Sequence, residues 1–142
     1  MKYTQQEMLD RLNSRDKETL MSTLNIEFIE VTDKKLVARM PVTPKVHQPD
    51  GVLHGGATVA LAETVGSVAA FLFLKNPNAK VQIRGIDIAA NHVKGISEGY
   101  VYATATALHI GKTLQLWSIP VTNQEGELIS QVKLSTIVLS KS

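Results

Sequence analysis

The stretch that decides the fold is residues 55–74, GGATVALAETVGSVAAFLFL. It is apolar on every side, rich in small residues and too long for a typical strand, which predicts a buried helix. A membrane span is the competing interpretation. Glu63 lies near the centre, however, where a carboxylate in lipid would cost about 2.5 kcal/mol or more, and the uninterrupted apolar part is only residues 65–74. The sequence therefore predicts the central helix of a globular domain.

Two short helices are expected before the first strands. Thr4 and Glu7 have the spacing of a capping box, in which side chains hold the free amides at a helix start. Apolar residues then recur at helical intervals at positions 8, 9 and 12, so a short amphipathic helix is predicted there. A further helical turn or two is predicted through residues 20–24.

Most of the remaining chain has strand patterns. Two strands within residues 26–40 surround a polar turn, and three prolines make residues 41–53 a loop. Beyond the helix, the alternation over residues 81–90 changes phase at Gly85, which is typical of a bulge. Three more strands are predicted, at residues 100–108, 114–121 and 128–139.

The order of these elements decides the fold class. A helix, two strands, one long helix and then four strands exclude alternating βαβ winding. This order favours an α+β fold in which a sheet curls around the central helix, whose small residues let the sheet approach closely. Pro120 lacks an N–H group, so its strand is expected at an edge of the sheet or bulged at that point.

The composition limits the partners. The 142 residues fit one domain, residues 1–142, and a charge of +2 without a basic block argues against nucleic acid. There is no cysteine, and the four histidines lack metal-ligand spacing, so neither thiol chemistry nor a metal or other cofactor is expected. The start of the chain has no apolar signal region, so a cytoplasmic protein without a membrane anchor is expected.

Glu63 is the first candidate for chemistry, because a carboxylate on an otherwise apolar helix must be neutral, paired or in use. A structural acid held by a backbone or arginine partner is an equally strong interpretation. Ser67 lies four residues on, on the same helical face, where its hydroxyl could orient the carboxylate or a water molecule. A serine in a buried helix more often bonds back to the preceding turn, so Ser67 adds support only.

The second candidate is the start of the helix, His54-Gly55-Gly56. A helix start offers free amides and a partial positive charge, and glycine lets a ligand approach, so this is a candidate oxyanion hole. Gln48, in the loop before it, could donate to the same oxygen. The alternative is that the glycines only make the turn, His54 caps the helix and Gln48 faces water.

The distance between the two candidates constrains a mechanism. Gly55 and Glu63 are eight residues apart, which on a helix is about 12 Å and too far for one carbonyl carbon. If both act, Gly55 of one copy must meet Glu63 of another, as in a two-fold dimer with antiparallel central helices. The sequence therefore predicts two equivalent sites at a subunit interface.

Such a site suits acyl chemistry. Hydrogen-bond donors hold a carbonyl oxygen as it becomes anionic, and a carboxylate attacks the carbon or deprotonates a water molecule. No strong general acid is evident in the sequence. A thioester is favoured over an amide, because a thiol with a pKa of about 8.5 leaves as thiolate without a proton.

The motif around these residues is also that of a known family. Residues 48–57, QPDGVLHGGA, and residues 61–67, LAETVGS, resemble the signature of hotdog-fold acyl-CoA thioesterases of the PaaI-like group. The branch that they most resemble includes 1,4-dihydroxy-2-naphthoyl-CoA hydrolases of menaquinone synthesis and Arthrobacter-type 4-hydroxybenzoyl-CoA thioesterases. The resemblance covers residues 24–139. It implies a hotdog fold, an antiparallel sheet wrapped around a long central helix, in a homodimer or homotetramer.

The resemblance implies roles at matching positions. Glu63 would be nucleophile or general base, Gly55 the backbone oxyanion donor with Gln48 and His54 in support, and Ser67 a positioner of water or carboxylate. The substrate would be an acyl-CoA with an aromatic or medium acyl group, and further residues would line its CoA groove. They are Gly85, His92, Val93, Lys94, Gly95, His109, Ile110, Gly111, Lys112, Thr113 and Leu114. Related sequences often carry Arg-Ser in place of Lys94-Gly95, so a cation for phosphate is kept but the bidentate grip of arginine is lost.

Two other functions are open to the same fold. An acyl-CoA-binding regulator would sense a thioester without cleaving it, but a binder has no reason to keep a carboxylate beside an electrophilic carbonyl. A hydroxyacyl dehydratase pairs a histidine with an acid for proton transfer at carbon, whereas His54 is better placed at the oxyanion end. The hydrolase is the favoured prediction.

Overall fold

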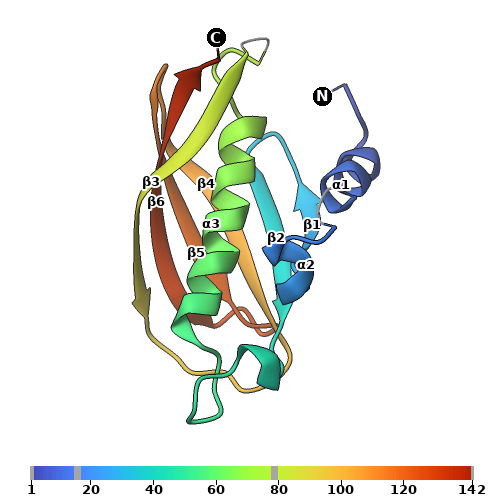
Figure 1. Ribbon diagram of the computed structural model, residues 1–142, viewed down its shortest axis with the longest axis vertical. Helices are drawn as coiled ribbons and strands as arrows, with labels where there is room; N and C mark the ends of the chain where they lie inside the picture. Colours follow the sequence, from blue (N-terminus) through green and yellow to red (C-terminus); the bar gives the residue numbers. More distant parts are fainter. Residues whose placement is uncertain (1, 15–16, 78–79, 142) are drawn as a thin grey trace.

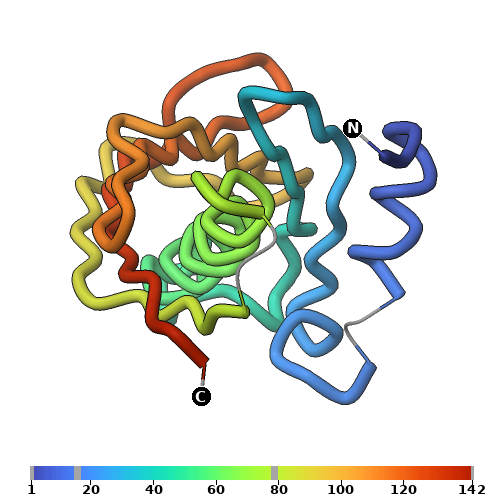
Figure 2. The backbone as a smooth tube through the Cα atoms, turned by 90° about the horizontal axis from the view of Figure 1, so that it is seen from above, coloured from blue at the N-terminus to red at the C-terminus, as the bar shows by residue number. Residues whose placement is uncertain are grey.

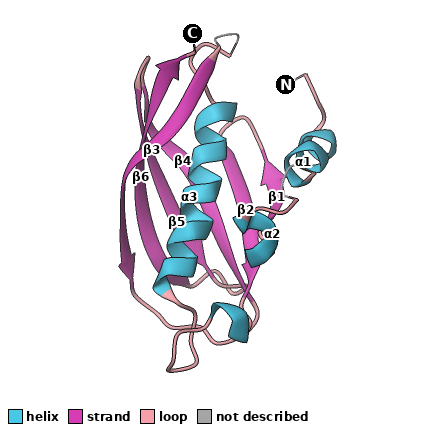
Figure 3. Cartoon of the chain, in the orientation of Figure 1, coloured by secondary structure: helices cyan, strands magenta, loops and turns pink. Residues whose placement is uncertain are grey.

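The computed structural model describes residues 2–14, 17–77 and 80–141 (Figure 1). Along the chain, two short α-helices and two strands come before one long α-helix, and four strands follow that helix (Figure 3). The elements are α1 (Gln5–Asn13), α2 (Leu20–Leu24), β1 (Glu27–Val31), β2 (Lys35–Pro41), η1 (Pro44–Val46), α3 (Gly55–Leu72), β3 (Val81–His92), β4 (Tyr100–Ile110), β5 (Leu114–Thr122) and β6 (Leu128–Ser140).

The strands form one antiparallel sheet in the order β1-β2-β4-β5-β6-β3. The sheet curls around α3, and α1 lies outside it against the β1 edge (Figure 2). The α+β fold with a sheet wrapped around one long helix is therefore confirmed. β3 is the other edge of the sheet, and its outer side has no strand partner among the described residues.

Local sequence explains where the elements begin. The hydroxyl of Thr4 accepts the N–H of Glu7 at 3.1 Å and starts α1, as the capping spacing predicts. β1 and β2 form the predicted hairpin around residues 32–34. The register of β3 against β6 shifts between Gly85 and Asp87, so the predicted bulge is confirmed.

Four details differ from the predictions. α3 ends at Leu72 rather than at residue 74, and the loop at 41–53 contains the short helical turn η1. Pro120 lies in β5, an interior strand, and the paired residues of β4 and β5 skip its position because proline has no N–H to donate. α3 is also not buried all round: one face packs on the sheet and the other, which carries Glu63, is uncovered in the single chain.

The covered face of α3 approaches the sheet most closely at Gly66. A methyl group there would lie 2.5 Å from Leu134 Cδ2 and 2.7 Å from Ile119 Cδ1, so any larger residue would force these side chains to move. Both neighbours are fully buried in the core. Gln115 secures the far end of the helix, since its buried amide donates to the carbonyl oxygen of Ala70 at 3.1 Å. These contacts set the line of α3 and so the position of its N-terminus.

α3 alone among the described helices has the length and composition to cross a bilayer, a property that core helices of soluble proteins share. Its buried residues pack against the sheet of the same domain. The helix is thus accounted for as the core helix of the fold.

Candidate active site

A tight loop delivers the chain to the N-terminus of α3. The N–H of Gln48 donates to the carbonyl oxygen of Val52 at 2.8 Å, and Gly51 between them has a φ of +84°, which favours glycine. The N–H of Leu53 donates to Ile96 O at 2.8 Å, which ties the loop to the segment after β3. The start of the helix is therefore held by both its own loop and a distant part of the chain.

The first amides of α3 are used unequally. His54 caps the helix, as one of the two interpretations predicted: its Nδ1 accepts the N–H of Gly56 at 2.8 Å. Its carbonyl oxygen accepts the N–H groups of Ala57 at 3.0 Å and Thr58 at 3.2 Å. The N–H of Gly55 makes no hydrogen bond to any described residue. One backbone donor is thus left free at the positive end of the helix dipole.

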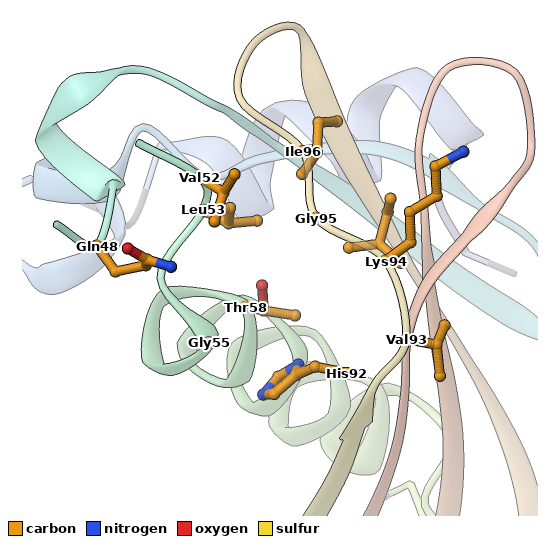
Figure 4. Close-up of a pocket in the computed structure, with 11 residues that line it drawn as sticks. Gln48, Val52, Leu53, Gly55, Thr58, His92, Val93, Lys94, Gly95 and Ile96 are labelled. Atoms are coloured by element: carbon orange, nitrogen blue, oxygen red, sulfur yellow. The ribbon is translucent and has the colours of Figure 1, made fainter. Parts of the chain in front are cut away.

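This end of α3 borders a pocket of about 380 Å³ (Figure 4). The pocket brings together residues that lie about 40 positions apart in the chain, from the loop and helix start and from the segment after β3. Besides Lys94, its polar side chains and free donor come from a small group: Gln48, Gly55, Thr58 and His92. Predicted catalytic residues Gln48 and Gly55 therefore share one pocket with the predicted substrate-binding residues His92, Val93, Lys94 and Gly95.

Gln48 is oriented by its own loop. Its Oε1 accepts the N–H of Asp50, so the amide nitrogen is directed towards the pocket (Figure 4). Two amide N–H bonds are then available to a ligand. Gln48 is thereby arranged as a donor beside the free N–H of Gly55.

His92 forms the opposite wall. A methyl group on Gly55 would lie 2.8 Å from His92 Nε2, so the helix start and the imidazole are in close contact. The other ring nitrogen, Nδ1, is 3.0 Å from the hydroxyl of Ser130, which itself lies 3.2 Å from Asn91 O. If Ser130 donates to that carbonyl, His92 Nδ1–H donates to Ser130 and Nε2 presents a lone pair to the pocket.

Lys94 has a partner of its own. Its ammonium pairs with the carboxylate of Glu127, in the turn between β5 and β6, and its side chain extends away from the pocket (Figure 4). This hydrogen bond, with a further one from Asn123, holds the pKa of Glu127 below its ordinary value. Both side chains are about half exposed, so the pair is open to competition by another anion.

Glu63 lies outside this pocket. It is exposed on the uncovered face of α3, and its Oε2 would be 3.0 Å from a methyl group on Gly85 of β3. The structure thus brings two predicted site residues, Glu63 and Gly85, into contact. Ser67, one turn further along, lines a different groove towards α1 and makes no hydrogen bond to Glu63 in the described chain.

The second predicted substrate-binding segment lies at the opposite end of α3. Gly111, Lys112 and Thr113, in the turn between β4 and β5, share a pocket with Leu74 and Lys75, which follow the end of the helix. His109 packs its Nε2 against Gly111, and Leu114 O accepts the N–H of Gly111 at 2.8 Å, so these residues form a tight turn, completed by Ile110. One chain therefore separates its predicted CoA-binding residues along the length of α3.

Two polar residues that shape the pocket were not predicted from the sequence: Thr58, which lines it, and Ser130, which lies behind His92. Thr58 is buried, and its hydroxyl points into the pocket (Figure 4). It lies three residues after Gly55 on the same face of α3, so the predicted helix could have identified it. Ser130, which positions His92, comes from β6 and no sequence signal pointed to it. The described residues contain no group of three side chains suited to hold a metal ion.

The chain matches the model of the thioesterase superfamily over residues 50–130, which include the end of the loop, α3 and the strands β3, β4 and β5. It is 38% identical to 1,4-dihydroxy-2-naphthoyl-CoA hydrolase of Escherichia coli over 131 residues, which cover 92% of this chain and 94% of that protein.

Solved structures agree with the fold. A thioesterase variant of Pseudomonas aeruginosa superimposes with a TM-score of 0.87 at 36% identity, over 92% of this chain and 93% of that one. A thioesterase of Staphylococcus aureus superimposes at 0.79 and 33% identity, over 84% of this chain and 98% of that one. That enzyme was crystallised with a glutamine changed to alanine and, separately, with a glutamate fifteen positions later changed to alanine.

Proposed function

The chain belongs to the thioesterase superfamily and is a thioester hydrolase, and from that premise we propose that it hydrolyses an aromatic or medium-chain acyl-CoA to the free acid and CoA. Glu63 of one copy acts as nucleophile or general base on a carbonyl held by Gly55 of another.

The observation that carries this proposal is the free N–H of Gly55. Its three following amides are occupied by His54, so a single backbone donor and the amide nitrogen of Gln48 converge on one pocket. A thioester oxygen bound there would gain both hydrogen bonds as it becomes an oxyanion. Thr58 and His92 complete a polar end to the pocket, whose remaining lining is apolar except for Lys94.

The reaction needs no general acid. Glu63 either attacks the carbonyl carbon, forming an anhydride that water then hydrolyses, or takes a proton from the water that attacks. In both routes the C–S bond breaks and the sulfur leaves with its electron pair as thiolate. With Glu63 as general base the oxygen of water enters the acid; in the anhydride route it enters the acid or Glu63, according to which carbonyl carbon water attacks. A thiol with a pKa of about 8.5 can leave without protonation.

A second copy supplies the carboxylate. Within one chain, Glu63 is separated from Gly55 by two turns of helix and does not border the Gly55 pocket. Two copies related by a two-fold axis, with their α3 helices antiparallel, place each Glu63 near the other chain's Gly55. The uncovered face of α3, where Phe71 is 52% exposed, is then buried.

The free edge of β3 supports the same dimer. It is twelve residues long, its outer backbone groups pair with no strand of the described chain, and Ile86 is 54% exposed. Long exposed edges pair readily with another strand. Pairing of β3 with its counterpart in a second copy would join two sheets and bring the Gly85 and Glu63 contact to the interface.

One further feature supports the assignment. Gln48 and Glu63 are separated by fifteen positions, as are the glutamine and glutamate changed in the Staphylococcus aureus thioesterase. We expect such an assembly also to bring the segments 92–95 and 109–114 together in one CoA groove, with Lys94 and Lys112 as cations for phosphate.

The test is release of free thiol from thioesters. 1,4-Dihydroxy-2-naphthoyl-CoA, the substrate in the name of the Escherichia coli relative, benzoyl-CoA and straight-chain acyl-CoAs are compared for the natural chain, Glu63→Gln and the exposed control Glu98→Gln. We expect Glu63→Gln to lose at least about 100-fold in kcat and the control to be unchanged. Undiminished hydrolysis by Glu63→Gln would remove Glu63 from the mechanism, and binding without hydrolysis by the natural chain would favour a sensor.

A further inference from the structure

A second groove, of about 630 Å³, lies between α1 and the second half of α3. Its walls are mostly apolar, from Met8 and Leu12 of α1 to Val68, Phe71 and Leu72 of α3. Arg11 is the one charged residue among those that line it. A groove of this kind suits an apolar group that ends in a polar substituent.

The groove continues from Glu63 along two elements. On α3, Ser67 lies four residues after Glu63 on the same face and lines the groove. On β3, Ile83 lines the groove two residues before Gly85, on the same side of the strand, and Gly85 contacts Glu63. Both walls therefore lead from the carboxylate into the groove. From Glu63 to Phe71 is eight residues, or about 12 Å of helix, enough for a ring or a medium acyl chain.

Arg11 is held in a way that leaves its donors free. Its guanidinium lies over the ring of Tyr3, 4.6 Å from the centroid, and Lys2 approaches the same ring at 5.8 Å. Stacking uses the face of the guanidinium, and its N–H groups point outward from the edge. Arg11 makes no salt bridge among the described residues, although Glu7 and Asp10 are on the same helix.

We propose that this groove holds the acyl group of the thioester and that Arg11, stacked on Tyr3, selects acyl groups with an acidic oxygen at the end remote from the thioester. The proposal rests on the proposed function, because it places the reacting carbonyl beside Glu63. A carboxylate is the group that a guanidinium edge binds best, through two parallel hydrogen bonds. Arg11 is thus a specificity residue remote from the reacting bond.

The test separates recognition from hydrolysis. Binding of two thioether analogues, S-phenacyl-CoA and S-(4-carboxyphenacyl)-CoA, is measured by calorimetry for the natural chain, Arg11→Met, Arg11→Lys and the exposed control Lys17→Met. Neither analogue can be hydrolysed, since a methylene group separates the carbonyl from sulfur. In parallel, kcat and KM are measured for benzoyl-CoA and 4-carboxybenzoyl-CoA. Arg11→Met keeps an apolar side chain on α1, and its thermal midpoint is compared with that of the natural chain.

We expect the carboxylated analogue to bind the natural chain and Lys17→Met about tenfold more tightly than the plain one. Arg11→Met should reduce that ratio to below about twofold, and Arg11→Lys should restore part of it. In the kinetic arm, Arg11→Met should raise KM for 4-carboxybenzoyl-CoA and leave kcat unchanged. Equal affinities in the natural chain, an unchanged ratio in Arg11→Met, or equal loss for both analogues would overturn the proposal. Binding in the expected ratio without hydrolysis of any thioester would overturn only the proposed function; no binding of either analogue would overturn both.

Discussion

Glu63 rests against Gly85 across the gap between α3 and β3: a methyl group on Gly85 would lie 3.0 Å from Glu63 Oε2. The carboxylate is exposed and its contact is with the backbone of an edge strand. Gly85 therefore sets where the reacting oxygen of the proposed site can lie. The absence of a side chain at Gly85 lets the carboxylate remain close to the helix and the strand at once.

Gly85→Ala should lower activity with little change in stability. The added methyl group meets the end of a flexible side chain, which moves by a few tenths of an ångström rather than straining the fold. We expect kcat to fall about tenfold, because small misplacements of a reacting group are costly. Steady-state kinetics, the thermal midpoint and the oligomeric state are measured together. An unchanged kcat would show that the Glu63 and Gly85 contact does not position the reacting group.

Gly55 and His92 should be coupled. Gly55→Ala places a methyl group 2.8 Å from His92 Nε2, so the imidazole must leave its position beside Ser130. We expect kcat/KM to fall at least about tenfold in Gly55→Ala, and much less when the change is made in His92→Ala, where room exists. A double-mutant cycle on kcat/KM measures the coupling. Losses that simply multiply would mean that the two residues act independently.

Gly66→Ala should destabilise the fold without touching the proposed site. The new methyl group would press into Leu134 and Ile119, at 2.5 and 2.7 Å. Overpacking of this kind costs about 1–3 kcal/mol of the free energy of unfolding. Urea denaturation measures the loss, and the same change in a Leu134→Val background should cost less. An equal cost in both backgrounds would place the strain elsewhere.

The pKa of Glu127 should depend on Lys94. The ammonium of Lys94, and then the amide of Asn123, hydrogen-bond the carboxylate and hold its pKa below 4.5. A carboxyl with a lowered pKa in the folded chain contributes stability above its ordinary pKa and loses it as the pH falls through the lowered value. NMR titration should show the Glu127 pKa rising towards its ordinary value in Lys94→Met. CoA added to the natural chain should raise it too if Lys94 exchanges Glu127 for phosphate, and a pKa indifferent to CoA would remove Lys94 from the groove.

The fold could be predicted because its main signals are local. The long apolar segment, the capping residues Thr4 and Glu7 and the phase change at Gly85 each specify a structure within a few residues. Pro120 was wrongly expected at an edge or in a bulge. It lies in the interior strand β5, where the pairing with β4 is interrupted at its position, so its missing N–H breaks no hydrogen bond. Such an interruption depends on tertiary structure and has no local signal. The burial of α3 was overestimated because apolar residues on all sides of a helix do not indicate which face its own sheet covers, and only one face packs on the sheet.

The site could be predicted only in part. Gln48, His54 and Gly55 are close in sequence, and one loop explains their meeting. His92 joins them through the sheet, and its positioning by Ser130 depends on the pairing of β3 with β6, which no local pattern specifies. The separation of Glu63 from Gly55 followed from helix geometry alone.

The claim on which the account depends is that each site uses two copies of the chain, and mixed subunits test it most directly. Glu63→Gln subunits are combined in equal amounts with subunits that lack the Gly55 donor. The second kind carries Gly55→Pro, because proline has no N–H and is tolerated at the first helical position. It also carries His92→Ala, which makes room for the proline ring. Each preparation alone should be inactive. If sites are shared, half of the dimers are mixed and carry one intact site of two, so about a quarter of the natural activity should return. No return of activity, with mixed dimers demonstrated by mass spectrometry, would contradict the account.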